Sequence, residues 1–403
     1  MKIRKNTFAE ILCFIAIAAA LITQFPYIDK GFASAFNEVM WILAAGFIVV
    51  DNFRQIPVSN YLLVMSIIVV FSYVAENVLL VIGAISSMMP YATLIRIPIL
   101  IYFCSYYIGT TENDECSVGK KMLLVFGTLA SIMSIQVAAQ FVTNFEAWKN
   151  TQLYLYNGAT HKNSSAQTLG NCILVLFVFW NPKKKIYKLL RYVGVLIAVL
   201  GLLYIQSRGA LVAIGIVIVV SAFFRGDKKK VFFALAAILI VVLIIVNSES
   251  IMGILRQAFF IDKYSSGGKL DLNRFSSGRL DFWASTWNYF LDSPLIGKGY
   301  TYCDNFYINI LASGGILIGG PYVVLYLVRV YKNIWYYRQS IKCGKIDSFT
   351  QLAAVVSIFY MMISMFEGFP PYGPGVSCLM FWMIGGYLDG KSRRENLRER
   401  RNI

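Results

Sequence analysis

The sequence predicts an all-α polytopic membrane protein with about 12 transmembrane helices and one large extracytoplasmic loop. Of its 403 residues, 58% are hydrophobic and only 14% are charged, and the mean hydropathy is +0.62. Soluble domains carry roughly a quarter charged residues, so this composition is typical of a protein surrounded by lipid. Long apolar runs alternate with short polar ones along the chain, and most of the 37 lysines and arginines fall in every second polar segment.

Each apolar run is long enough to be considered as a membrane-crossing helix. The predicted spans are 8–25, 34–50, 61–82, 91–109, 121–143, 166–180, 190–206, 209–224, 231–247, 304–328, 350–368 and 374–389. Three of them (166–180, 190–206 and 209–224) are short, so broken or re-entrant helices there stay open as an alternative. The first run is not followed by a cleavage site and a soluble mature domain, and we therefore expect no cleaved signal peptide.

The spans divide the chain into four regions. Residues 1–247 would hold nine N-terminal helices, 248–303 an extracytoplasmic loop domain, 304–389 three C-terminal helices, and 390–403 a basic cytoplasmic tail. With the N-terminus inside, the basic clusters all fall on the inner side, which satisfies the positive-inside rule and places both termini in the cytoplasm.

The formal charge of +16 could suggest a nucleic-acid partner. The distribution of the charge argues against it, because the basic loops lie where anionic lipid headgroups would attract them; we expect membrane lipid as the partner and no nucleic acid. The seven cysteines include no CxxC pair, and most lie within spans, so neither a disulfide framework nor a zinc site is predicted.

An arginine occupies an unusual place in the tripeptide Ser207-Arg208-Gly209, between two apolar runs on the predicted outer side. A membrane protein keeps arginine at such a place when an anion compensates its charge. The alternative is an arginine that snorkels to the membrane surface. The position of Arg208 on the side where positive charge is disfavoured favours a functional role.

The predicted outer loop combines cations with aromatic rings. Its basic residues are Arg256, Lys263, Lys269, Arg274 and Arg279, and its aromatic residues include Phe275, Phe282, Trp283, Trp287, Tyr289, Phe290, Tyr300 and Tyr302. Guanidinium groups bind phosphate oxygens bidentately, and ring faces can stack on the C–H faces of sugars. The loop therefore suits a ligand that contains both phosphate and sugar.

Residues 279–292 are predicted to form an amphipathic helix. Apolar and aromatic side chains, among them Trp283 and Phe290, recur at spacings of three and four residues. Pro294, followed by a pair of nearby glycines, would end the helix before the next span. The aromatic residues fit an interfacial belt at headgroup level or a substrate platform, and both alternatives stay open.

An ordered set of short motifs lies between about residue 205 and residue 330. In chain order these are Ser207-Arg208-Gly209, Gly278-Arg279, Trp283, Pro294, Gly297, Gly299 and Asp304-Asn305. At these residues the chain resembles the O-antigen polymerase/ligase superfamily of bacterial membrane glycosyltransferases. The ligase branch has histidine where this chain has Asp304, so the resemblance favours the polymerase (Wzy-type) branch.

The resemblance implies an enzyme of the bacterial plasma (inner) membrane. It would polymerise oligosaccharide repeat units linked to polyprenyl (undecaprenyl) diphosphate into a cell-surface polysaccharide on the outer face. Arg208 and Arg279 would stabilise the leaving diphosphate, and Asp304 would be the general base. No DxD-type acidic pair is evident on the outer side, so we expect neither a metal nor another cofactor. Other implied partners are a chain-length regulator and a flippase; the alternative functions are a glycan ligase and a transporter or flippase of lipid-linked oligosaccharide.

Several further residues are candidates for substrate binding, each with an alternative role. The candidates are Arg274, Trp283, Asn305, His161, Arg96 and Glu367. His161 lies in a polar stretch that a simple turn would explain, and Asp304 could merely begin a helix. Arg96 and Glu76 lie within neighbouring spans, where we favour a buried ion pair that joins those spans over a phosphate contact. Glu367 borders an outer turn that could line the cavity.

Overall fold

A computed structural model of the protein describes most of the chain. The described ranges are 5–25, 28–52, 57–109, 117–146, 162–205, 207–224, 265–266, 269–270, 278–344, 347–373 and 377–401. The predicted span 231–247 and the candidate residues His161 and Arg274 lie outside these ranges. For Arg208 the backbone is described, whereas the side chain lies outside the description.

The described part of the chain is helical apart from one short antiparallel strand pair, in which Ser265 pairs with Leu270. The elements are α1 (Lys5–Ile22), α2 (Lys30–Asp51), α3 (Asn60–Val81), α4 (Tyr91–Tyr102), η1 (Phe103–Ile108), α5 (Ser117–Thr143), α7 (Lys162–Leu174), η2 (Val175–Phe179), α8 (Lys185–Ile205), α9 (Arg208–Phe224), β1 (Ser265–Ser266), β2 (Lys269–Leu270), α14 (Arg279–Asp292), α15 (Phe306–Gly314), η3 (Gly315–Gly319), α16 (Gly320–Lys342), α17 (Ser348–Ile363) and α18 (Ser377–Arg401). The three η segments are π-helical; η1 and η2 continue α4 and α7, whereas η3 follows a break at Gly315 and continues into α16.

The all-helical class is confirmed for the described residues, and helices overlap each predicted span that lies in the described ranges. Within those ranges, five segments are long and apolar enough to cross a membrane: Lys30–Asp51, Asn60–Val81, Phe126–Thr143, Lys185–Ile205 and Phe306–Lys342. Shorter apolar helices cover most of the other predicted spans. The count of about 12 spans and the large loop stay predictions. The predicted boundary at residues 389 and 390 falls inside α18, which continues to Arg401.

Apolar side chains cover the outward faces of several peripheral helices. Ile42 on α2 is 69% exposed, Ile67 on α3 is 56% exposed and Leu196 on α8 is 58% exposed. Soluble monomers rarely expose continuous apolar surfaces, because water would meet them at a large free-energy cost. These faces therefore suit contact with lipid, whereas α17 and the first part of α18 are buried in the centre of the bundle.

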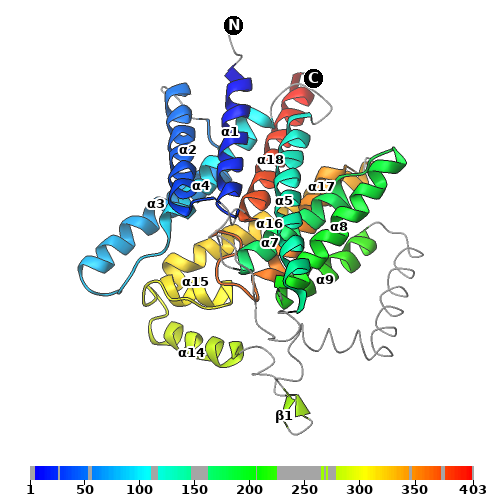
Figure 1. Cartoon of the computed structure of the whole chain (residues 1–403). Coiled ribbons are helices and arrows are strands. Elements are labelled where there is room, and N and C mark those ends of the chain that lie inside the picture. The colour runs from blue at the N-terminus through cyan, green and yellow to red at the C-terminus, as the bar shows by residue number, and fades with distance from the viewer. Residues whose placement is uncertain are drawn as a thin grey trace.

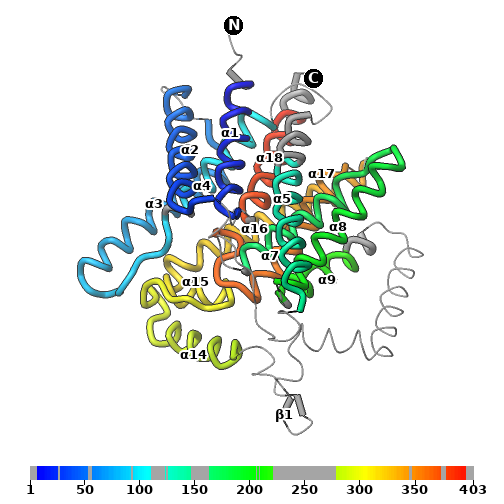
Figure 2. Tube along the Cα trace, in the orientation of Figure 1, coloured from blue at the N-terminus to red at the C-terminus, as the bar shows by residue number. Residues whose placement is uncertain are grey.

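The bundle has two distinct ends. Figure 1 shows the start of α1 and the end of α18 together at one end, and α14 at the opposite end. Figure 2 traces α14 and α15 side by side at that second end. We call these the termini end and the α14 end. The starts of α7, α9 and α15 and the segment after α17 contribute to the α14 end, as the contacts described below show.

The predicted ion pair between Glu76 and Arg96 is wrong. Arg96 on α4 pairs instead with Glu38 on α2. The carboxylate of Glu76 accepts the backbone N–H of Met89 at 2.7 Å, because the segment after α3 folds back along that helix. Adjacency in sequence placed Glu76 and Arg96 on neighbouring spans, but the rotation of α4 about its axis directs Arg96 toward α2.

Two glycines let the turn after α14 pack directly against the break between α15 and η3. Gly297 has φ +70°, and a Cβ there would lie 2.2 Å from the carbonyl oxygen of Ser313. Gly315 has φ +62°, and its Cβ would lie 2.4 Å from the carbonyl oxygen of Leu295. Side chains cannot fit at such distances. Four backbone hydrogen bonds join the segments: Lys298 N to Ala312 O (3.0 Å), Gly299 N to Ser313 O (3.0 Å), Ile316 N to Pro294 O (2.8 Å) and Leu317 N to Leu295 O (3.0 Å).

Candidate active site

Helix α14 lies against α15 and brings one face to the start of that helix. The predicted helix over 279–292 is confirmed, with Gly278 at φ +77° before its first residue. Thr286 and Phe290 are buried on the inner face, one turn and two turns after Trp283. Phe282, Trp287 and Tyr289 are each more than 40% exposed, as an interfacial aromatic belt requires. The inner face thus packs on α15, and Arg279 lies at the beginning of that contact.

Asp304, which directly precedes the N-cap residue of α15, is held by three side chains. Arg279 Nε donates to Asp304 Oδ2 at 3.2 Å, and the hydroxyl of Tyr302 donates to Oδ1 at 2.5 Å. Trp283 Nε1 donates to the backbone carbonyl of Asp304 at 3.1 Å. Both carboxylate oxygens therefore already accept hydrogen bonds. The side chains of Arg279 and Asp304 are 24% and 22% exposed, so the pair is reachable from outside.

Arg279 also faces a second carboxylate, which belongs to the turn after α17. Arg279 Nη2 lies 3.8 Å from Glu367 Oε1, and Asn163 Nδ2 at the start of α7 donates to Glu367 Oε2 at 2.9 Å. The side chain of Glu367 is only 10% exposed. Glu367, in the turn after α17, therefore links α7 through Asn163 with α14 through Arg279.

The start of α15 is joined to the end of α17 by hydrogen bonds that fix this geometry. The Asn305 side chain caps α15 by accepting the N–H of Ile308 at 3.2 Å, and its Nδ2 donates to the carbonyl of Met365 at 3.3 Å. Asn309 Nδ2 donates to the carbonyl of Gly368 at 3.2 Å. Asn305, predicted to bind substrate, is 7% exposed and contributes here to the position of Asp304 relative to Glu367.

A cavity of about 400 Å³ opens beside these groups. Its walls come from α7, from the turn before α15 and from the turn after α17, and they are lined by Asn163, Ser164, Gln167, Tyr300, Tyr302, Glu367, Gly368, Phe369, Pro370 and Gly373. The rings of Tyr300 and Phe369 stack with their centroids 5.8 Å apart and their planes 18° from parallel. The cavity thus offers a carboxylate, several amide and hydroxyl groups and aromatic rings, which together suit a carbohydrate.

Burial also sets the protonation of two groups in the turn before α15. Burial, followed by the hydrogen bond to Asp304 and the charge of that carboxylate, raises the pKa of Tyr302 well above its usual value of 10.0. Burial likewise raises the pKa of the Cys303 thiol. Tyr302 therefore stays a protonated donor to Asp304, and Cys303 stays a neutral thiol at neutral pH.

Arg208 begins α9 at the same end of the bundle. A Cβ added at Gly209 would lie 3.1 Å from Cβ of Phe366, the residue directly before Glu367. The backbone of Arg208 is thus next to the turn that carries Glu367. Arg96 is placed elsewhere, in its pair with Glu38, and it does not line the cavity.

Sequence reasoning did not single out Asn163 and Gln167, or the neighbouring Ser164, and it named Tyr300 and Tyr302 only among the loop aromatics. The polar run at the beginning of the predicted span 166–180 was the available signal for the first two. Tyr302 was visible as one of many loop aromatics, and only the structure distinguishes it by its contact with Asp304.

Residues 193–323 match the family model described as O-Antigen ligase. No match was found among curated proteins. The matched segment contains Arg208, Arg279 and Asp304, so the resemblance to the O-antigen polymerase/ligase superfamily is confirmed. The match and the apolar helices together indicate a multi-pass membrane protein that handles glycans in the manner of the O-antigen ligases and polymerases.

Proposed function

We propose that this protein is a membrane glycosyltransferase that polymerises oligosaccharide repeat units linked to polyprenyl diphosphate, on the outer face of the bacterial plasma membrane. One observation carries the proposal: Arg279 lies between the carboxylates of Asp304 and Glu367, beside a polar and aromatic cavity. A cation next to a carboxylate supplies the two groups that glycosyl transfer from a diphosphate needs.

The basic residues at the termini end of the bundle support an orientation in which the α14 end faces outward. The start of α8 carries Lys185, Lys188 and Arg191, and the ends of α16 and α18 carry further basic residues. By the positive-inside rule, the termini end faces the cytoplasm and the α14 end faces outward. The cavity beside Arg279 then opens on the side where a flipped lipid-linked substrate resides.

The proposed reaction replaces one bond to the anomeric carbon by another. A hydroxyl oxygen of the acceptor repeat unit attacks the anomeric carbon at the reducing end of the growing chain. The bond from that carbon to the diphosphate oxygen breaks, and its electron pair leaves with polyprenyl diphosphate. Arg279, together with Arg208, stabilises the developing negative charge. The hydroxyl proton passes to a carboxylate of the site.

Glu367 is the carboxylate we favour as the proton acceptor. It lines the cavity, whereas Asp304 does not, and a general base must reach the hydroxyl that it deprotonates. Asp304 uses both carboxylate oxygens to hold Arg279 and Tyr302. We therefore assign Asp304 a positioning role. The sequence-based assignment of Asp304 as the base is tested in the same experiment.

A ligase that passes the chain to a different acceptor is the second candidate, because the matched family is described as O-Antigen ligase. Both reactions use the same donor chemistry at Arg279 and differ only in the acceptor. Asp304 in place of the ligase histidine favours the polymerase.

Reconstitution of the purified full chain with synthetic polyprenyl-diphosphate repeat units, without other proteins, tests the proposal. A polymerase produces a ladder of lipid-bound lengths and releases polyprenyl diphosphate. Single units that react only when a foreign acceptor is added would indicate the ligase. Units that cross the bilayer chemically unchanged would contradict both enzymes and indicate a flippase.

Variants of the two carboxylates assign the base. We expect Glu367→Gln to remove the ladder. Asp304→Asn should weaken the ladder, and a stronger base added to the solution should not restore the activity of Asp304→Asn. Asp292→Asn is the matched control, because Asp292 lies on α14 with a side chain that is 61% exposed, outside the cavity. A normal ladder from Glu367→Gln together with none from Asp304→Asn would return the base role to Asp304.

A further inference from the structure

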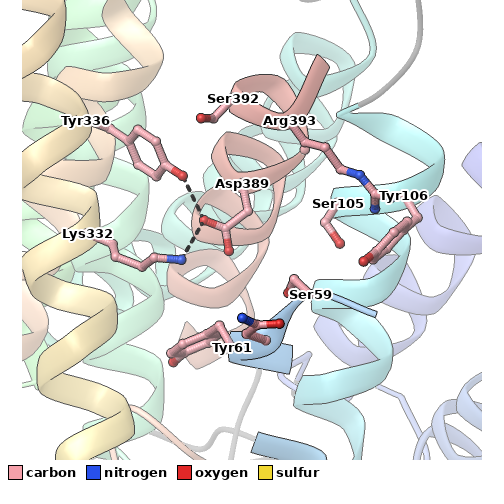
Figure 3. A pocket seen from close by; sticks show the side chains of 11 residues that line it. Ser59, Tyr61, Ser105, Tyr106, Lys332, Tyr336, Asp389, Ser392 and Arg393 are labelled. Atoms are coloured by element: carbon pink, nitrogen blue, oxygen red, sulfur yellow. Dashed lines mark hydrogen bonds and ion pairs between the residues drawn. The ribbon is translucent and has the colours of Figure 1, made fainter. Parts of the chain in front are cut away.

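A second cavity, of about 500 Å³, lies at the termini end of the bundle. Figure 3 shows its walls, which come from the start of α3, from η1, from α16 and from α18. Its lining residues are Ser59, Asn60, Tyr61, Ser105, Tyr106, Lys332, Tyr336, Asp389, Gly390, Ser392 and Arg393. None of these residues belongs to the site around Arg279.

The one carboxylate among these lining residues, Asp389, already pairs with a buried arginine that does not line the cavity. Arg329 Nη2 lies 2.7 Å from Asp389 Oδ2, and the Arg329 side chain is fully buried. The hydroxyl of Tyr336 donates to Asp389 Oδ1 at 3.0 Å, and Lys332 Nζ lies 3.5 Å from the same oxygen. Arg329 thus supplies the principal counter-charge, so Lys332 retains positive charge to offer to the cavity.

Arg393 adds a second cation to the cavity. Its guanidinium extends toward η1, where its Cζ lies 4.6 Å from the centroid of the Tyr106 ring (Figure 3). Among the described residues, Arg393 has no ion pair with a carboxylate, whereas Lys391 two residues earlier pairs with Asp347 at 3.0 Å. The aromatic face holds the guanidinium in place without cancelling its charge.

Neutral groups in the lining suit an anion as well. The cavity includes three serines, of which Ser105 already donates to the carbonyl of Tyr102 at 3.3 Å and Ser392 bonds to the Tyr336 hydroxyl, so Ser59 is the serine that matters here. Ser59 is the N-cap of α3 and accepts the N–H of Leu62 at 3.3 Å, which leaves its own proton available to a ligand. The 22-residue helix α3 directs the positive end of its dipole to this wall.

We propose that this cavity binds a phosphate-bearing anion between Lys332 and Arg393. Two cations, the Ser59 hydroxyl and a helix start supply the kinds of donor that phosphate oxygens accept. The volume lies within the range of small-molecule sites. The anionic headgroup of a membrane phospholipid and free phosphate share this chemistry. The proposal does not depend on the glycosyltransferase activity proposed above.

Melting of the purified full chain in a neutral detergent tests the site. The probes are short-chain phosphatidylglycerol, inorganic phosphate and short-chain phosphatidylcholine, each added over a range of concentrations. We expect an anionic probe to raise the melting temperature of the wild type in a saturable way. Arg393→Gln and, independently, Lys332→Gln should each weaken the apparent affinity about ten-fold, because each removes a charge-assisted contact.

Arg338→Gln is the matched control, since Arg338 lies on α16 near Lys332, is exposed and does not line the cavity. A response to phosphatidylglycerol alone would identify a lipid headgroup, and an equal response to inorganic phosphate would identify a soluble phosphate; both support the site. An unchanged affinity in both cavity variants, no response from the wild type, or an equal response to phosphatidylcholine would overturn the proposal.

Discussion

The protein contains the same trio of residue types at both ends of its bundle. At the α14 end, Asp304 accepts hydrogen bonds from Arg279 and Tyr302 at 3.2 and 2.5 Å. At the termini end, Asp389 accepts from Arg329 and Tyr336 at 2.7 and 3.0 Å. The local chemistry of the two clusters is therefore nearly identical, whereas their surroundings differ.

The surroundings decide what each arginine can do. The Arg329 side chain is 0% exposed and Gly385 leaves room for it, since a Cβ at Gly385 would lie 2.7 Å from Arg329 Cδ. Arg279 is 24% exposed and shares its charge between Asp304 and Glu367 beside a cavity. A fully buried pair is costly to break, and a reachable arginine can exchange partners with a ligand. Arg329 is thus enclosed within the bundle, whereas Arg279 can be reached by a ligand.

The largest effect is expected from breaking the buried pair. Arg329→Met should destabilise the protein by about 3–5 kcal/mol, because it leaves the buried Asp389 carboxylate without its counter-charge. The yield of folded protein and its melting temperature in detergent measure this loss. Adding Asp389→Asn should restore much of the stability, since the unpaired charge is then absent. A stable Arg329→Met protein would show that Lys332 alone compensates Asp389.

Removing the reachable arginine should affect catalysis and leave the fold intact. If the proposed reaction holds, Arg279→Ala should raise the barrier to product formation by about 2–4 kcal/mol, a hundred-fold or more in rate, because the proposed diphosphate leaving group loses a charge-assisted contact. Arg279→Lys should recover little of the rate, since lysine cannot form the bidentate contact. The reconstituted assay gives the rate, and the melting temperature should match the wild type. Product formation at the wild-type rate in Arg279→Ala would contradict the role of Arg279.

A smaller loss is expected at Tyr302. Tyr302→Phe removes one donor to the Asp304 carboxylate and should slow product formation by about 1.5 kcal/mol, roughly ten-fold. Because the pKa of Tyr302 is raised above its usual value of 10.0, its phenol stays protonated up to and beyond pH 10. Its contribution to the rate would be lost only as the pH rises through the higher pKa that Tyr302 has in the folded protein. Below that pKa, the rates of the wild type and of Tyr302→Phe should therefore depend on pH in the same way. Tyr289→Phe, on the exposed face of α14, is the control.

The smallest effect is expected at the indole of Trp283. Trp283→Phe keeps an aromatic side chain, although a smaller one, and removes the N–H that donates to the Asp304 carbonyl, which should cost about 1 kcal/mol. A rate lower by a few-fold in the reconstitution assay is the expected result. Trp287→Phe, with a side chain that is 41% exposed, should leave the rate unchanged. Equal effects of the two substitutions would mean that the aromatic belt, and not the Asp304 contact, decides the rate.

The sequence by itself determined the helical class of the protein, the approximate positions of its described helices and the residues of α14. Composition and apolar run length fix helices in lipid because backbone groups must be paired within each span. The helix over 279–292 was predicted to the residue, since the spacing of its apolar side chains and the glycines and proline around it are local signals. The motif with Arg279, Trp283 and Asp304 was likewise recognisable in order.

Only the tertiary structure decided which side chains meet. Asn163 and Glu367 are 204 positions apart in sequence and 2.9 Å apart in space, and no local pattern links them. Glu76 and Arg96 lie on neighbouring spans, yet Arg96 pairs with Glu38, because packing sets the rotation of each helix about its axis. For the same reason the sequence singled out Arg279 by its motif but could not show that Arg329 is fully buried while Arg279 is 24% exposed. Arg329 is buried by the helices around it, whereas Arg279 lies beside a cavity. This difference in burial is a property of the assembled bundle.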